Sequence, residues 1–204
     1  MLAGCNVTPP RLAPTLVTTE QTVQFTAVPL QRAWINIPTA LVIIQRGLAG
    51  SMEQRIGLPN TSTVQGDNMV LLRARRPDRD RSGRLAFAEF LDRAGGAPAP
   101  FATLESGDLL TGEDSLGPYF WAEKRSGNDT ICVLALRRLT SGTRQLPRDY
   151  NVLDVMMRNC VTGPLDLALA PITATHLGFA YGVSDAATSG KSRMLSPLAG
   201  PTPR

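Results

Sequence analysis

Two apolar segments, residues 131–136 and 152–161, lie on either side of a turn-rich stretch that contains Leu146-Pro147. The second segment alternates apolar and polar residues, as a half-buried strand does, and the first is apolar on both faces, as a fully buried strand is. A hairpin centred on Leu146 places Cys132, fourteen residues before it, directly opposite Cys160, fourteen residues after it. Opposed residues in an antiparallel pair have Cα atoms about 4.5–5.5 Å apart, inside or near the range that a disulfide bridges. We therefore predict a Cys132–Cys160 disulfide between adjacent strands, which would stabilise the fold by about 2–4 kcal/mol.

The alternative is a pair of buried free thiols in a reducing compartment. A shift of the strand register by one residue would place the two thiols on opposite faces of the sheet. Because an oxidising compartment favours the disulfide, the choice between the two depends on whether the protein is exported.

The first residues of the chain raise the question of export. Leu2-Ala3-Gly4-Cys5 resembles a bacterial lipobox, in which signal peptidase cuts before the cysteine and the cysteine thiol carries a diacylglycerol. Small residues such as Ala3 and Gly4 are typical of such a cleavage site. We therefore expect a signal peptide, lipidation at Cys5 and, because Asn6 rather than Asp follows the cysteine, an anchor at the periplasmic face of the outer membrane. The alternative is a chance tetrapeptide in a cytoplasmic protein.

The whole chain divides into three parts. Residues 1–20 contain the lipobox and a tether rich in Pro and Thr, residues 21–183 form a single globular domain, and residues 184–204 form a tail predicted to be disordered. The domain reads as an α+β fold, with a mainly antiparallel β-sheet and two or three short helices. Besides the hairpin, strands are expected over residues 22–28, 40–44, 52–58 and 69–73, and helices over residues 29–34, 85–94 and 164–176, the last interrupted at Pro171. The continuous apolar run 40–44 predicts a central strand covered on both faces.

Charge and hydropathy restrict the partners. The chain has no apolar run near 18 residues, so a lipid on Cys5 would be its only membrane attachment. The 21 Lys and Arg residues exceed the 17 Asp and Glu residues, giving a net charge of +4, which favours an anionic partner or surface. Nucleic acid is not expected, because the basic residues are scattered and aromatic residues are few.

One segment matches the twelve-residue calcium loop of an EF-hand. Its side-chain ligands would be Asp78, Asp80, Ser82 and Glu89, with the carbonyl oxygen of Arg84 as a further ligand. Pro77 stands where the entering helix should end, no second loop is present in the sequence, and three arginines reduce the negative charge. The alternative is a surface connection that leads into a helix, with Asp80 or Ser82 as its N-cap.

The densest aromatic cluster is Tyr119-Phe120-Trp121, for which we expect core packing beside a turn, with an exposed binding patch as the alternative.

Catalysis is not expected, and no catalytic residue is assigned. The single histidine, His176, lies in an apolar context, and no nucleophile elbow, Walker loop or zinc spacing is present.

Several short stretches resemble the BcsN family of cellulose biosynthesis accessory proteins of alphaproteobacteria. They are Ala33–Pro38, Met52–Leu58 with Gly66–Asn68, Leu116–Tyr119, Cys132–Leu136 and Arg158–Cys160, which lie within residues 25–175. The resemblance implies an envelope protein that works with a cellulose synthase and secretion apparatus, and it assigns no catalytic residue.

These observations lead to one functional expectation and two alternatives. We expect a non-catalytic, lipid-anchored periplasmic protein that supports the biosynthesis or export of an exopolysaccharide, namely cellulose, as part of an envelope complex. The first alternative is a structural accessory lipoprotein of a pilus or conjugation system. The second is a calcium-binding module built on the loop from Asp78 to Glu89.

Overall fold

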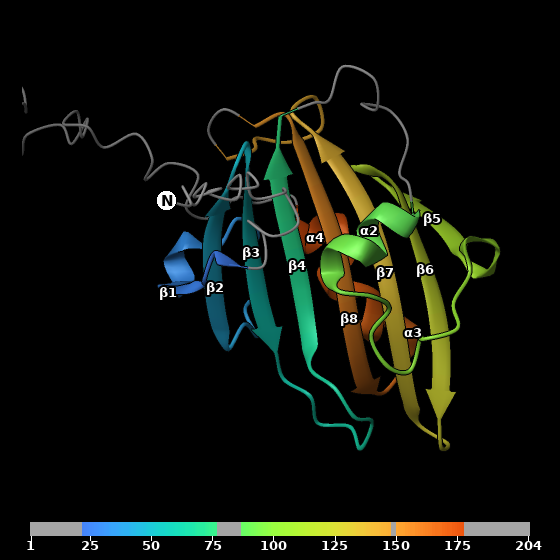
Figure 1. Cartoon of the computed structure of the whole chain (residues 1–204). Coiled ribbons are helices and arrows are strands. Elements are labelled where there is room, and N and C mark those ends of the chain that lie inside the picture. The colour runs from blue at the N-terminus through green and yellow to red at the C-terminus, as the bar shows by residue number, and fades with distance from the viewer. Residues whose placement is uncertain (1–21, 77–86, 148–149, 178–204) are drawn as a thin grey trace, which may run out of the picture.

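The protein forms one eight-stranded antiparallel sheet with a few short helices, so the predicted α+β class is confirmed (Figure 1). The computed structural model describes residues 22–76, 87–147 and 150–177. The strands are β1 (Thr26–Val28), β2 (Val42–Leu48), β3 (Ser51–Leu58), β4 (Asn68–Arg75), β5 (Leu110–Asp114), β6 (Gly117–Ser126), β7 (Thr130–Thr140) and β8 (Val152–Thr162). The helices are α2 (Phe87–Ala94), α3 (Leu165–Leu169) and α4 (Ala174–Leu177), and the 3-10 turns are η1 (Leu30–Arg32), η2 (Ser106–Asp108) and η3 (Ala170–Ile172).

The strand order is β1-β2-β3-β4-β8-β7-β6-β5, which is two four-stranded meanders joined through their last strands. Within each meander, strands that are neighbours in sequence are also neighbours in the sheet, as antiparallel strands joined by direct chain reversals usually are. The pairing of β4 with β8 brings together segments about 80 residues apart in the sequence, with Arg73 opposite Asp154. This central pairing determines which side chains of the two meanders meet.

One face of the sheet, here called the helical face, carries the larger apolar core. Its strand residues include Ile56, Val70, Leu72, Val133 and Val155, which are buried by residues 33–37 and by α3, η3 and α4 (Figure 1). The predicted helix over residues 164–176 is thus divided into three short pieces, with Pro171 in the middle one. Proline lacks the N–H of a continuing helix, which explains the interruption.

The opposite face, here called the arginine face, is divided in two. Helix α2 and the segment around Phe101 cover the half formed by β6, β7 and β8, where Phe90, Phe101, Leu134 and Met156 make a second apolar cluster (Figure 1). The half formed by β2, β3 and β4 carries charged side chains instead, and these, together with Asp154 of β8 and Arg138 of β7, make up the site described below.

The run at residues 40–44 was predicted to be a central strand covered on both faces, and this prediction is wrong. It enters β2, which is next to the short edge strand β1. Ile43 is buried, but Leu41 is 65% exposed and Val42 is 49% exposed. The composition of a strand reports its apolarity, whereas its position depends on the pairing of the other strands.

In the described ranges, no helix is long and apolar enough to cross a membrane.

Candidate functional site

A row of alternating charges crosses five neighbouring strands on the arginine face. The directly opposed pairs are Arg46 with Glu53, Glu53 with Arg73, Arg73 with Asp154, and Asp154 with Arg138. Side chains of successive strand residues alternate between faces, so directly opposed residues lie on the same face of the sheet. Opposite charges at opposed positions attract each other, which stabilises this register over its neighbours.

Glu53 is the first of two buried carboxylates in this row. Its Oε2 accepts hydrogen bonds from Arg46 Nη2 at 2.7 Å and Arg46 Nε at 3.0 Å, and its Oε1 accepts one from Arg55 Nε at 3.0 Å. The Glu53 side chain is only 1% exposed. A carboxylate removed from water in this way depends on these charge-assisted hydrogen bonds for its stability.

Asp154 holds the second pair of arginines. Its Oδ1 accepts a hydrogen bond from Arg138 Nε at 2.6 Å, and its Oδ2 accepts one from Arg75 Nε at 3.0 Å. The Asp154 side chain is 4% exposed. Each buried carboxylate therefore joins two arginines, which ties β2 to β3 on one side and β4 and β7 to β8 on the other.

Aromatic rings lie against the guanidinium groups at both ends of the row. The ring of Phe25 lies 4.4 Å from Arg46 Cζ and 4.6 Å from Arg55 Cζ, and the ring of Phe90 lies 5.8 Å from Arg138 Cζ. A cation over an aromatic face is attracted by the ring quadrupole, and the ring also limits the movement of the side chain. Arg46, Arg55 and Arg138 thus each contact both a carboxylate and an aromatic ring.

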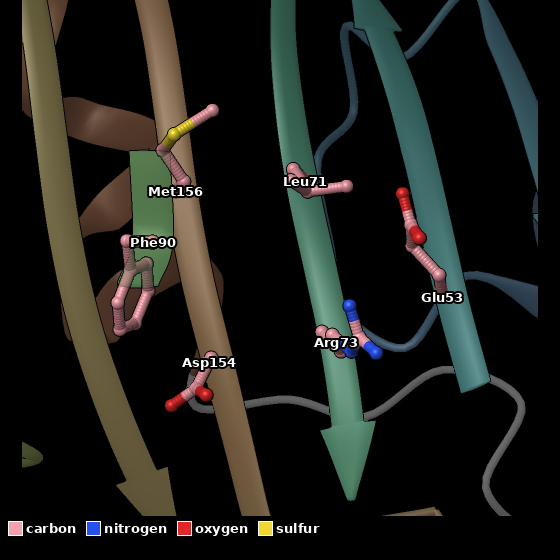
Figure 2. Close-up of a pocket in the computed structure, with 6 residues that line it drawn as sticks. All are labelled: Glu53, Leu71, Arg73, Phe90, Asp154 and Met156. Carbon is pink, nitrogen blue, oxygen red and sulfur yellow. The ribbon is translucent and has the colours of Figure 1, made fainter. Parts of the chain in front are cut away.

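A small pocket lies where the charged half of this face meets the apolar half. Figure 2 shows the side chains that line it, from β3, β4, β8 and α2: Glu53, Leu71, Arg73, Phe90, Asp154 and Met156. The charged groups in its lining are one guanidinium, that of Arg73, and the two carboxylates of Glu53 and Asp154. Guanidinium and carboxylate groups held side by side in this way form strong, directional hydrogen bonds.

The predicted Cys132–Cys160 disulfide is confirmed. The two residues are directly opposed on β7 and β8, as the hairpin register predicted, and their Sγ atoms are bonded. Their Cα atoms are 3.9 Å apart, which is closer than the range expected for opposed residues without a bridge. Both cysteines are fully buried in the apolar cluster of the arginine face.

We expect the double variant Cys132→Ala/Cys160→Ala to lose about 3 kcal/mol of the free energy of unfolding, because the unfolded chain is no longer cross-linked. Urea denaturation of the wild type and the double variant measures the difference. The wild type treated with reductant should shift toward the variant. Coincident unfolding curves for all three samples would contradict the prediction.

The other predicted site residues are placed as follows. Five of them lie outside the described residues: Cys5, Asp78, Asp80, Ser82 and Arg84. The backbone of Glu89 belongs to helix α2. Among the residues that the structure describes, no cluster of His, Cys, Asp or Glu is arranged to hold a metal ion. Calcium binding by the loop that starts at Asp78 stays a prediction.

The aromatic cluster Tyr119-Phe120-Trp121 lies on β6, and its residues are partly buried. Tyr119 and Trp121 pack against the core of the helical face with their ring centroids 5.6 Å apart, while alternation directs Phe120 to the other face. Core packing of Tyr119 and Trp121 is therefore confirmed. A β-carbon on Gly112, which is opposite Tyr119, would lie 2.5 Å from the tyrosine ring, so glycine is needed for this contact.

Sequence reasoning missed three buried arginines. Arg137 on β7 is fully buried and is paired with both carboxylate oxygens of Asp114, and it also donates to the carbonyl oxygens of Gly117 and Ile172. Arg158 on β8 is 1% exposed, and Arg144 is 7% exposed. Burial lowers the pKa of Arg144 to about 10. The strand alternation in the sequence assigns Arg137 and Arg158 to faces, but it does not show that loops and helices cover them.

The Arg137–Asp114 pair predicts how stability depends on pH. Burial raises the pKa of Asp114, but hydrogen bonds from Arg137, Leu116 and Ala174 outweigh it and leave the pKa below its ordinary value. The ionised form is thus favoured in the folded state, so this stabilisation is complete above the unfolded pKa and is lost as the pH falls through the folded pKa.

We expect Asp114→Asn to lose about 2 kcal/mol at pH 7, because Arg137 then has no counter-charge. The difference from the wild type should shrink as the pH falls below about 4, where the unfolded wild-type carboxyl binds a proton. Urea denaturation at a series of pH values measures it. A difference that stays constant from pH 7 to pH 3 would contradict the assignment.

Comparison with known proteins adds no relative to this picture. No protein-family model matches the chain, and no curated protein and no solved structure is significantly similar to it.

Proposed function

We propose that this protein is an exported lipoprotein of the cell envelope that supports the assembly or export of an exopolysaccharide without catalysing a reaction. The observation that carries the proposal is the buried Cys132–Cys160 disulfide. Structural disulfides form and persist in oxidising compartments such as the bacterial periplasm and are rare in the cytosol. The bridge therefore supports the exported interpretation of Leu2-Ala3-Gly4-Cys5 over the cytoplasmic one.

The attachment to a membrane is proposed through a lipid on Cys5. Seventeen positions separate Cys5 from Thr22, where the described domain begins. A fully extended chain of that length spans at most about 60 Å. The tether is therefore long enough for the domain to contact partners at a distance from the membrane surface.

The role in an envelope complex is supported by the arginine face. Its row of arginines, held in place by Glu53, Asp154 and two phenylalanines, presents an ordered charged surface, and such surfaces give interfaces their specificity. Cellulose is proposed as the polymer on the strength of the resemblance of Met52–Leu58, Cys132–Leu136 and the other short stretches to the BcsN family. Within the proposal, the protein acts as a scaffold that positions other components of the apparatus.

Lipidation is tested by expressing the gene in its native cell with a radiolabelled fatty acid and separating the membrane fractions. We expect label on the wild type in the outer membrane, and no label on Cys5→Ser, which should become soluble in the periplasm. Label that persists in Cys5→Ser, or a wild type that carries none, would overturn the lipoprotein proposal.

The role in polysaccharide export is tested separately by deleting the gene. We expect secreted cellulose to fall, or its arrangement at the cell surface to change, and to be restored by the wild-type gene. Secretion and arrangement that are both unchanged in the deletion strain would rule out this role while leaving the lipid anchor intact.

A further inference from the structure

A cavity opens on the helical face, at the end of the sheet where β3 and β8 finish. Its volume is about 310 Å³, and its walls come from the segment before β2, the residues that follow β3, the end of β8 and the C-terminal helices. Ile37, Leu58, Val161, Leu167, Pro171 and His176 contribute to the lining. This volume is at the lower end of the range of small-molecule sites in proteins.

The chemistry of the lining selects an uncharged and mainly aliphatic ligand. Most of the wall is made of aliphatic side chains and prolines, and its polar groups include the hydroxyls of Thr39, Thr61 and Thr162. No Asp, Glu, Lys or Arg occurs among the described residues that line it. A charged ligand would lose its hydration there without gaining a counter-charge, which is strongly unfavourable.

His176 supplies a directional polar group to this wall. Its Nδ1 lies 2.9 Å from the carbonyl oxygen of Asn36, and its own carbonyl oxygen accepts a hydrogen bond from the Asn36 N–H at 3.0 Å. A carbonyl oxygen only accepts, so the contact assigns the proton to Nδ1 and leaves Nε2 of the neutral ring as an acceptor. In the part of the chain that the structure describes, Nε2 has no hydrogen-bond partner.

We propose that this cavity is a binding site for a small uncharged ligand with an aliphatic body and a hydroxyl group. The aliphatic body packs against Ile37, Leu58, Val161 and Leu167, and the hydroxyl group donates a hydrogen bond to Nε2 of His176. A hydroxyl group fits both forms of the ring, because it donates to neutral Nε2 and accepts from a protonated one. The site goes beyond the proposed function, since it requires neither the lipid on Cys5 nor a polysaccharide.

Octan-1-ol is the probe for this class, and octanoate at pH 8 and glucose are the matched comparisons. Octanoate keeps the aliphatic chain but carries a charge, and glucose keeps the hydroxyls but lacks the chain. The full-length, disulfide-bonded protein is titrated with each, and binding is followed by backbone amide chemical shifts. We expect saturable shifts around the cavity with octan-1-ol, at least about tenfold weaker binding of octanoate, and no saturable shifts with glucose.

Two substitutions and one control locate the site. Leu167 is 52% exposed, so Leu167→Asp should fold normally and weaken octan-1-ol binding at least about tenfold by placing a charge at the cavity. His176→Phe removes the acceptor but keeps an apolar ring, and it should weaken binding about three- to tenfold. Leu110→Asp is the control, because Leu110 is 50% exposed on β5 and does not line the cavity, and its binding should equal that of the wild type.

The proposal is overturned if octan-1-ol causes no saturable shifts at the cavity up to its solubility limit. It is also overturned if Leu167→Asp, folded by its amide spectrum, binds octan-1-ol as tightly as the wild type. Equal binding of octanoate and octan-1-ol would overturn the preference for an uncharged ligand, and saturable binding of glucose would overturn the aliphatic class.

Discussion

Replacement of Glu53 with Gln is expected to lower the free energy of unfolding by about 3–5 kcal/mol, the range for breaking a buried ion pair by removing one partner. Glu53 accepts three hydrogen bonds from Arg46 and Arg55 and is 1% exposed. Gln keeps the size of the side chain but removes its charge. The two guanidinium groups, both within 5 Å of the Phe25 ring, would then face each other without a carboxylate between them.

The matched control is Glu123→Gln. Glu123 is 30% exposed and lies 3.7 Å from Arg125, which is 64% exposed, so this surface pair is screened by water. We expect its loss to cost less than about 1 kcal/mol. Urea denaturation of both variants at neutral pH measures the contrast, and equal losses for Glu53→Gln and Glu123→Gln would contradict the structural role of the charged row.

A double variant separates charge imbalance from the loss of packing. In Glu53→Gln/Arg46→Gln, a guanidinium that has lost its contact with the Glu53 carboxylate is also removed, so we expect about 1–2 kcal/mol of the loss to be recovered. If the stability losses of the two single variants instead add up in the double variant, Glu53 acts through its packing alone. Denaturant midpoints of the two single variants and the double variant close this thermodynamic cycle.

The second large effect is expected for Arg158→Met, which should lose about 4 kcal/mol of the free energy of unfolding. Arg158 donates to the carbonyl oxygens of Ala99 at 2.6 Å, Gln65 at 2.6 Å and Gly66 at 3.0 Å. It also donates to Asn68 Oδ1 at 3.0 Å. Hydrogen bonds to charged donors contribute about 1.5–3 kcal/mol each, and the variant leaves four acceptors without this donor.

Part of this loss is offset, because burial of the guanidinium is itself unfavourable. Burial lowers the pKa of Arg158, although the charge of Asp67 acts in the opposite direction. Met removes that cost and fills a similar apolar volume, which is why the expected loss is smaller than the sum of four charged hydrogen bonds. Arg158→Lys should also be destabilised, because a single ammonium group does not reproduce the spread of the guanidinium donors.

Urea denaturation of Arg158→Met measures the effect, with Arg125→Met as the control. Arg125 is 64% exposed, so its replacement should change the stability by less than about 0.5 kcal/mol. Amide hydrogen exchange adds a local test, since residues 65–68 and Ala99 should lose protection first in the variant. If the free energy of unfolding of Arg158→Met is within about 1 kcal/mol of the wild-type value, the loops at residues 65–68 and around Ala99 do not depend on Arg158.

Local patterns were sufficient to predict much of the fold. The alternation in residues 152–161 and the turn around Leu146 determined a hairpin register, and that register placed Cys132 opposite Cys160 as observed. The segments 52–58 and 69–73 were likewise predicted as strands, and they form β3 and β4, which pair with each other. These pairings are short-range, so the side-chain period and the turn suffice to define them.

The candidate site was not predictable in the same way. Arg46, Glu53, Arg73, Asp154 and Arg138 are scattered over more than 100 positions of the sequence, and each alone reads as a solvated strand residue. A one-residue change in any of the strand pairings would break up the row. The apolar cavity with His176 could not be predicted for the same reason, because its walls come from four separated segments.

The sequence by itself determined the α+β class, the hairpin around Leu146 and the disulfide, because these follow from local side-chain periodicity and turn chemistry. The tertiary structure alone decided that β4 pairs with β8, that the 40–44 run lies beside an edge strand, and that Arg137 and Arg158 are buried. The physical reason is that burial and charge pairing depend on which distant segments cover each face of the sheet. That choice is made by the packing of the whole domain, and no local stretch of residues encodes it.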